Sequence, residues 1–103
     1  MSFEVRRAIP VDHPSLAGHF PGEPIVPGVV ILDEVVAALT EWRKDWQLMG
    51  IHAVKFLLPL KPDQSFTICL SVPRTTETEV DFCCRADGHM VVEGRLEIRC
   101  DAF

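Results

Sequence analysis

His19 and Asp33 are two residues that can move protons, and fourteen positions separate them in the first third of the chain. His19 lies in a segment rich in proline and glycine, whereas Asp33 lies at the beginning of an apolar stretch. Histidine suits the role of a base because its pKa lies near neutral pH. A histidine in a loop also serves as a metal ligand or as a structural side chain, so His19 alone leaves three roles open.

Asp33 is the candidate acid, because helical spacing would surround it with aliphatic side chains. Its neighbours three and four positions away are Val29, Val30, Val36 and Ala37. A carboxylic acid among aliphatic groups loses hydration, which favours the neutral form that can donate a proton. A surface or capping aspartate is the alternative, and the adjacent Glu34 is a competing acid on a different helix face.

Gly28 lies where the loop becomes the helix. The first amides of a helix have no acceptor within it and favour negative charge. A residue without a side chain lets a carbonyl group approach these amides, which would stabilise an enolate. A glycine that merely starts the helix is the alternative. His13 and His19 have no third ligand at a recognisable spacing, so we expect no metal site.

A stiff loop and one helix would hold these residues in place. Residues 10–28 include eight proline or glycine residues, which exclude a regular helix or a central strand. Residues 29–46 include neither type, and their apolar residues recur at three- and four-residue spacing. This pattern predicts a helix of about 27 Å, which Gly50 would help to end.

The other segments alternate between apolar and polar residues. The alternation predicts antiparallel strands at residues 3–9, 53–58, 66–72, 80–87 and 90–99. Asp87-Gly88 predicts a tight hairpin between the last two strands. We therefore expect one α+β domain over residues 1–103, with one long helix against an antiparallel sheet that curls around it. The edge strand of such a sheet favours a dimer or a larger assembly.

Composition excludes several classes of protein. The chain has 103 residues, of which 48% are hydrophobic and 24% charged, as in a globular protein. No apolar run approaches the roughly 18 residues that span a bilayer, and a net charge of −5 argues against nucleic acid as a partner. The first residues do not resemble a secretory signal, which predicts a cytoplasmic protein with reduced thiols. We expect the four cysteines to be small buried hydrophobic residues, at Cys69, Cys83, Cys84 and Cys100.

The segment from Gly18 to Val29 resembles the signature of the hot-dog-fold 3-hydroxyacyl-[acyl-carrier-protein] dehydratases of the FabZ and FabA type. The resemblance lies in His19-Phe20-Pro21-Gly22, followed by Pro24 and Pro27-Gly28 at the spacing of the family. It continues more loosely through Lys55-Phe56, Pro59 and Asp87-Gly88. Asp33 is typical of the FabA type, whereas Phe20-Pro21-Gly22 is closer to FabZ, and Leu57 stands where FabZ proteins often have arginine.

The resemblance implies a hot-dog fold, in which a curved antiparallel sheet wraps one long central helix. It implies that His19 and Asp33, from opposite subunits of a dimer, form the catalytic pair, and that the Gly28 amide completes the site. The remaining motif residues would bind the substrate, namely Phe20, Pro21, Gly22, Ile25, Val26, Pro27 and Val29.

The implied activity is that of a lyase, which dehydrates a 3-hydroxyacyl thioester to the trans-2-enoyl thioester in fatty-acid or related lipid synthesis. The substrate would be held on acyl carrier protein, and no metal or organic cofactor is expected. A hot-dog thioesterase and a non-catalytic acyl-binding subunit of a heteromeric dehydratase are the alternatives. The assembly would be a homodimer, a larger homo-oligomer or a heterodimer.

Acyl carrier proteins are acidic, and this chain also carries a net negative charge. Docking would therefore need a local patch of basic residues near the mouth of the site. The candidates for this patch are Arg43, Lys44, Lys55 and Lys61.

Overall fold

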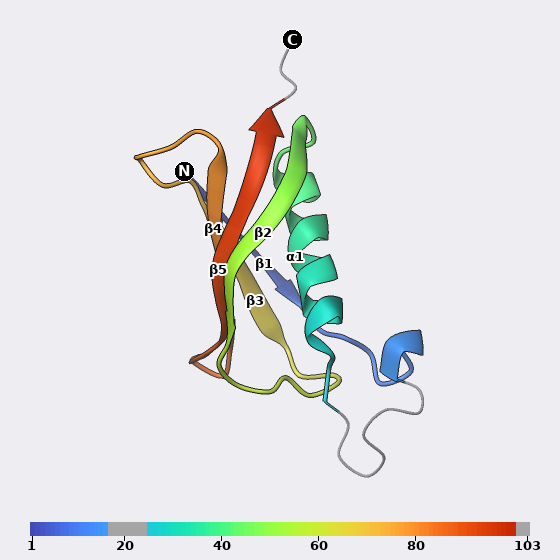
Figure 1. Ribbon diagram of the computed structural model, residues 1–103. Coiled ribbons are helices and arrows are strands. Elements are labelled where there is room, and N and C mark those ends of the chain that lie inside the picture. The colour runs from blue at the N-terminus through green and yellow to red at the C-terminus, as the bar shows by residue number, and fades with distance from the viewer. Residues whose placement is uncertain (17–24, 101–103) are drawn as a thin grey trace.

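The computed structural model describes residues 1–16 and 25–100 of the chain. The described residues form one sheet of five antiparallel strands, in the order β1-β3-β4-β5-β2, with one α-helix across one face (Figure 1). The elements are β1 (Ser2–Arg7), the short 3₁₀ helix η1 (Pro14–Leu16), α1 (Gly28–Trp42), β2 (Trp46–Phe56), β3 (Phe66–Ser71), β4 (Glu79–Ala86) and β5 (His89–Cys100). The predicted α+β class is confirmed.

The sheet curves around α1. The strands β1 and β2 are the two opposite edges of the sheet, and both contact the helix, as does β3. One helix can contact both edges of a five-stranded sheet only if the sheet bends toward it. The curved sheet predicted from the sequence is therefore present.

The helix is shorter than predicted. It ends at Trp42, and Arg43 leaves the helical conformation while its N–H donates to the Leu39 carbonyl at 2.8 Å. Trp46 begins β2, so Gly50 lies within that strand and does not end the helix. The Trp42 and Trp46 rings pack edge to face with centroids 5.4 Å apart. Because Trp42 and Trp46 are four residues apart, their spacing resembled a continuing helix, although Trp46 belongs to β2.

Among the described residues, no helix is long and apolar enough to cross a membrane.

Strand β2 begins well before the predicted residue 53. Two irregularities interrupt its pairing with β5, between Leu48 and Gly50 and between His52 and Lys55, where Ala53 has a φ of 54°. Each irregularity breaks the period-two pattern on which strand prediction depends.

The β4–β5 hairpin agrees with the prediction, because Asp87 and Gly88 have φ values of 52° and 79°. Two successive positive φ values are typical of a type I′ turn.

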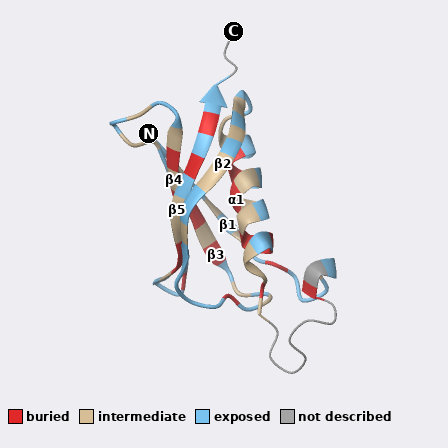
Figure 2. Ribbon diagram, in the orientation of Figure 1, coloured by how far each residue is buried: buried red, intermediate tan, exposed pale blue. Residues whose placement is uncertain are grey.

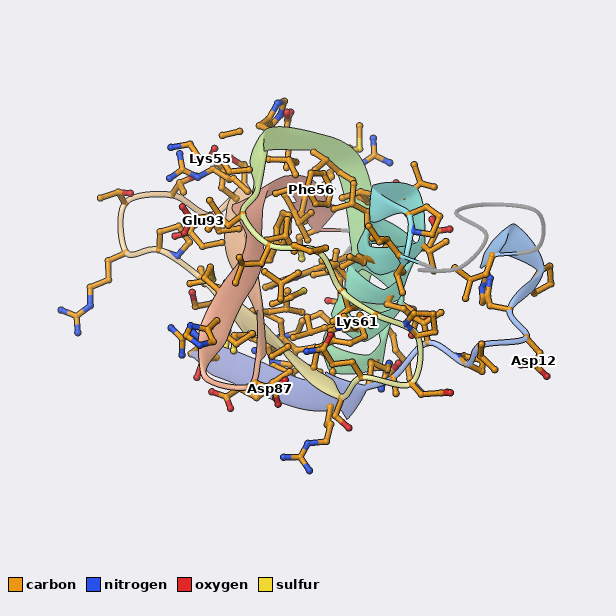
Figure 3. All side chains as sticks on the ribbon, turned by 90° about the horizontal axis from the view of Figure 1, so that it is seen from below. Asp12, Lys55, Phe56, Lys61, Asp87 and Glu93 are labelled. Carbon is orange, nitrogen blue, oxygen red and sulfur yellow. The ribbon has the colours of Figure 1, made fainter. Side chains whose placement is uncertain are left out.

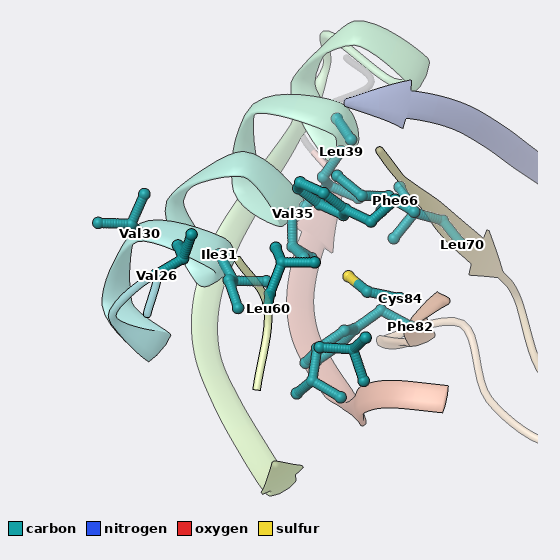
Figure 4. Close-up of a cluster of buried hydrophobic side chains, with 14 of the residues drawn as sticks. Val26, Val30, Ile31, Val35, Leu39, Leu60, Phe66, Leu70, Phe82 and Cys84 are labelled. Atoms are coloured by element: carbon teal, nitrogen blue, oxygen red, sulfur yellow. The ribbon is translucent and has the colours of Figure 1, made fainter. Parts of the chain in front are cut away.

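The core lies between α1 and the inner face of the sheet (Figure 2). Figure 4 shows Ile31, Val35 and Leu39 of the helix facing side chains of the strands. The strand side chains on this face are almost fully buried, among them Phe66, Ile68, Leu70, Phe82 and Cys84. Burial of each large apolar side chain stabilises the fold by about 1.5–3 kcal/mol.

The cysteines differ in burial, so the expectation that all four are buried is wrong. Cys84 is buried, Cys69 and Cys83 are half-buried, and Cys100 is exposed. Strand side chains alternate between the two faces of a sheet. Cys84 lies on the inner face, and its neighbour Cys83 therefore lies on the outer face.

Charged residues also join the helix to the sheet. The Arg7 Nε, at the end of β1, donates to Glu34 Oε1 at 3.1 Å, and the Arg7 guanidinium also contacts Glu41. A polar contact also joins two loops. The side-chain amide of Gln64, between β2 and β3, donates to Oδ2 of Asp87, between β4 and β5, at 2.8 Å. Figure 3 shows Asp87 and Lys61 in these loops.

We expect the Cys84 thiol to make the stability of the protein fall in alkaline solution. Burial, followed by the nearby thiols of Cys83 and Cys69, raises the pKa of Cys84 from 9.0 to about 12. Between these pH values the folded chain holds a proton that the unfolded chain has lost. The free energy of unfolding therefore decreases as the pH rises from about 9 to about 12.

Urea unfolding across this pH range measures the decrease. Cys84→Ala should give a less stable protein whose stability changes less steeply with pH, whereas the exposed Cys100→Ala should keep the steep dependence. Equal slopes for the unmodified protein and Cys84→Ala would contradict the prediction.

Candidate active site

The residues that lead into α1 are held against the segment that follows β2. The Val26 N–H donates to the Leu60 carbonyl at 2.8 Å, and both side chains are buried. The Leu57 N–H donates to the Val91 carbonyl of β5 at 2.7 Å, which ties the same segment to the sheet. The beginning of the helix therefore has a defined position relative to residues 57–60.

An apolar hollow of about 410 Å³ lies at this junction. Its lining consists of apolar residues from the helix start and from the segment after β2, namely Ile25, Val26, Gly28, Ile31, Phe56, Leu57, Leu58, Pro59 and Leu60. The side chains of Phe56, Leu57 and Leu58 remain 52%, 49% and 46% exposed in this chain. A hollow of this composition is suited to an aliphatic ligand, because binding removes apolar surface of both the ligand and the hollow from water, which is favourable.

Gly28 lies directly against the Phe56 ring. A Cβ atom built on Gly28 would lie 2.7 Å from Phe56 Cζ and 2.9 Å from Phe56 Cε1, which is closer than such contacts allow. Phe56 lies on the helix side of β2, whereas Lys55 lies on the other side (Figure 3). Glycine is therefore required if the ring is to lie over the start of the helix.

The helix start also supplies backbone donors. Pro27 is the N-cap residue and makes no side-chain capping bond, and the Val30 N–H donates to the Pro27 carbonyl at 3.0 Å. The amides of Gly28 and Val29 have no acceptor within the helix. Gly28 lines the hollow, so its amide, together with the helix dipole, favours a negative charge there.

The predicted site residues have different positions. His19, Phe20, Pro21 and Gly22 lie outside the described residues. Ile25 and Val26 line the hollow together with Gly28, whereas Pro27 and Val29 do not. Val29 is 67% exposed on the outer side of the helix.

Sequence reasoning did not identify the second wall of the hollow. This wall is the run from Phe56 to Leu60, with Ile31 beside it. A run of five apolar residues, in which the alternation of the strand fails, was the signal that could have identified it.

Asp33 is exposed, and it does not line the hollow of its own chain. The aliphatic surroundings expected for it are therefore not supplied by this chain, since Val29 and Ala37, one turn away on either side, are exposed as well. Glu34, the competing acid, is bonded to Arg7 at 3.1 Å. Of the two acids, Asp33 is thus the more exposed one, whereas Glu34 is engaged by Arg7.

A second, larger hollow of about 480 Å³ lies on the outer face of the sheet. Several of its lining residues are polar, including Lys55, Asp81, Glu93 and Arg95, and it does not include Gly28. No group of three or more histidine, cysteine, aspartate or glutamate side chains suited to a metal ion occurs in residues 1–16 and 25–100. The apolar hollow is the better candidate for the active site because Gly28, with its free amide at the helix start, lines it.

Comparison with known families gives a match over nearly the whole chain. A family model described as ApeI-like, ApeI dehydratase, matches residues 1–95. The chain is 31% identical over 100 residues to the 3-hydroxyacyl-[acyl-carrier-protein] dehydratase FabZ of Syntrophotalea carbinolica, covering 86% of this chain and 68% of that protein. It is 34% identical over 77 residues to the FabZ protein of Chlamydia trachomatis, covering 65% of this chain and 50% of that protein.

Solved structures show the same hot-dog architecture. The dehydratase heterocomplex ApeI:P from Xenorhabdus doucetiae aligns with a TM-score of 0.82 and 22% identity, covering 96% of this chain and 87% of that chain. A 1,4-dihydroxy-2-naphthoyl-CoA thioesterase from Synechocystis aligns with a TM-score of 0.72 and 11% identity, covering 97% and 82%. At these identities the likeness concerns the fold alone.

We expect Gly28 and Phe56 to be energetically coupled. Gly28→Ala should lower the free energy of unfolding, because the new methyl group collides with the Phe56 ring. In a Phe56→Ala background the collision is absent, and alanine should instead stabilise the helix by up to about 1 kcal/mol. Urea unfolding of the four proteins, at one protein concentration, should give a coupling energy of about 0.5–3 kcal/mol. The same effect of Gly28→Ala in both backgrounds would show that the ring does not lie there.

Proposed function

The chain belongs to the ApeI-like dehydratase family, and from this membership we propose that it is a lyase that dehydrates a 3-hydroxyacyl thioester to the trans-2-enoyl thioester. The observation that carries the proposal is the apolar hollow at the start of α1, where backbone amides and aliphatic side chains meet. An acyl chain fits the aliphatic walls, and a thioester carbonyl fits the amides. We place the reaction in fatty-acid or related lipid synthesis.

In the proposed reaction, the thioester carbonyl accepts a hydrogen bond from the Gly28 amide. His19, in its neutral form, removes a proton from the carbon next to the carbonyl, and the helix amides stabilise the negative charge that develops on the oxygen. Asp33 donates a proton to the hydroxyl group on the following carbon, which leaves as water. The double bond forms between these two carbons. The residues need no metal or organic cofactor for these steps.

The proposed site is shared between two chains. Asp33 is exposed and lies away from the hollow that contains Gly28 in the same chain. Phe56, Leu57 and Leu58 leave apolar surface uncovered, and β2 is an edge strand. A second copy would cover this surface and bring its own Asp33 to the hollow. A heterodimer with a related chain is the alternative assembly, and the similar structure from Xenorhabdus doucetiae is a heterocomplex.

We expect His19→Ala and Asp33→Asn each to lower the rate of dehydration by about 10²–10⁴-fold, as is typical for removing a positioned acid or base. The rate is measured by formation of the enoyl product from 3-hydroxyacyl-carrier protein. Asp45→Asn is the matched control, because Asp45 is exposed beyond the far end of α1. Near-normal dehydration by Asp33→Asn would refute the assignment of the acid.

Mixing the two inactive variants tests the shared site within the same experiment. Some mixed dimers carry one intact His19–Asp33 pair, so activity should return when subunits exchange. No recovery after demonstrated exchange would mean that both residues act within one chain.

We propose acyl carrier protein as the bearer of the substrate. Of the four basic candidates, Lys61 is exposed and directly follows Leu60 of the hollow. Lys55 lies on the outer face of the sheet. Arg43 packs on the rings of Trp42 and Trp46 at 5.5 and 5.3 Å. Arg43 and Lys44 follow a helix of 15 residues, so they lie about 22 Å from its start.

We expect Lys61→Glu to lower turnover of carrier-bound substrate several-fold, because it adds repulsion toward an acidic partner. Lys44→Glu makes the same charge change at the far end of the helix and should have little effect. Added salt should reduce the difference between Lys61→Glu and the unmodified protein, since it screens the repulsion. A small thioester analogue without a carrier should be turned over equally well by all three proteins. Equal losses for both variants would argue against docking beside the hollow.

Analysis of the reaction products also tests the two alternative functions, a thioesterase and a non-catalytic acyl-binding subunit. A thioesterase would release a free acid, and the structural likeness to the Synechocystis thioesterase concerns only the fold. A non-catalytic acyl-binding subunit would give no turnover without a partner chain. The cytoplasmic location remains a prediction from the sequence.

A further inference from the structure

The outer face of the sheet carries two thiols that lie directly opposite each other. Cys69 of β3 and Cys83 of β4 are partners in the antiparallel register. The same row continues to Glu4 on one side and to Glu93 and Lys55 on the other. Lys55 and Glu93 lie on the side of the sheet away from α1 (Figure 3). The two thiols are therefore separated from the proposed active site by the sheet itself.

The geometry of this pair suits a covalent bond. Residues directly opposite in antiparallel strands have Cα atoms about 4.5–5.5 Å apart, within the range of about 4.4–6.8 Å found for disulfides. Cys69 and Cys83 are half-buried, and Cys83 lies close enough to Cys69 to raise the pKa of its thiol, together with burial. Both residues line the outer hollow of about 480 Å³, which gives a small reagent access to them.

We propose that Cys69 and Cys83 form a cross-strand dithiol that a low-molecular-weight disulfide, such as glutathione disulfide, converts to an intramolecular disulfide. The thiolate of Cys83 attacks one sulfur of the reagent, whose S–S bond breaks and releases one thiol. Cys69 then loses its proton and attacks the Cys83 sulfur, which releases the second thiol. Two protein thiols are oxidised, and one reagent disulfide is reduced to two thiols.

The surroundings of the two thiols set the order of these steps. Burial, then the neighbouring Cys83, raises the pKa of Cys69 to about 11, so Cys69 holds its proton at neutral pH. Because the thiolate is the attacking species, this protonation disfavours Cys69 as the first nucleophile, and the proposal assigns the first attack to Cys83. Once Cys83 carries the mixed disulfide, Cys69 lies opposite it and needs no diffusion to close the bond.

The other two cysteines are less suited to this reaction. Cys84 follows Cys83 in sequence, but its side chain lies on the inner face with 0% exposure. Cys100 is exposed near the end of β5, and its thiol donates to Asp45 Oδ2 at 3.8 Å. In the test below, Cys84 therefore serves as the reference for a buried thiol and Cys100 as the reference for an exposed thiol.

The test treats the purified full chain with glutathione disulfide, blocks remaining thiols with N-ethylmaleimide, and maps linked peptides by mass spectrometry. The expected product has lost two hydrogen atoms and contains a Cys69–Cys83 link. Cys69→Ser should stop at one glutathione adduct on Cys83, and Cys83→Ser should form no internal link. Cys100→Ser, the matched control, should close as the unmodified chain does.

Three results would overturn the proposal. One is an unmodified chain that keeps a stable glutathione adduct on Cys83 without closing. Another is a link between Cys83 and Cys84, or between two chains through Cys100. The third is a failure of the unmodified chain to react at Cys69 and Cys83 while Cys100 is fully modified. Peptide mapping of the unmodified chain distinguishes these outcomes even if a serine variant does not fold.

Discussion

The packing of one helix against one sheet is the constraint on which the other features depend. Val35, Ala38 and Leu39 of α1 are almost completely buried against the inner face of the strands. Because a single helix must cover this face, the sheet bends until both of its edge strands contact the helix. The same packing defines where α1 begins, and therefore where the Gly28 amide meets the wall formed by Phe56 and Leu60.

The alternation of side chains along the strands separates two kinds of chemistry. The inner face is apolar and holds Cys84 in the core, whereas the outer face carries Cys69, Cys83 and charged residues. A single-residue step from Cys83 to Cys84 changes a half-buried thiol to a fully buried one. The proposed dehydration and the proposed dithiol reaction therefore use opposite faces of one sheet, and each can be examined without the other.

The described part of one chain leaves the proposed reaction incomplete. Asp33 faces solvent on α1, and the apolar residues Phe56, Leu57 and Leu58 are about half exposed. A carboxylic acid is most useful as a proton donor where its hydration is reduced. A second chain placed over β2 and the helix start would reduce the hydration of both features at once, which is the physical basis for proposing a shared site.

Features that depend on local backbone chemistry could be predicted from the amino-acid sequence alone. Proline and glycine residues predicted that the loop ends at Gly28, and alternation predicted β3, β4 and β5. The residue types of Asp87-Gly88 predicted the tight turn, in which both residues have a positive φ. The resemblance of the segment from Gly18 to Val29 to the dehydratases is confirmed by the family match. The roles of His19 and Asp33 remain predictions, since His19 lies outside the described residues.

Which segments of the chain contact one another is known from the three-dimensional structure and not from the sequence. The end of α1, the start of the irregular β2, the apolar wall from Phe56 to Leu60 and the pairing of Cys69 with Cys83 depend on contacts between residues far apart in the chain, which local patterns do not encode.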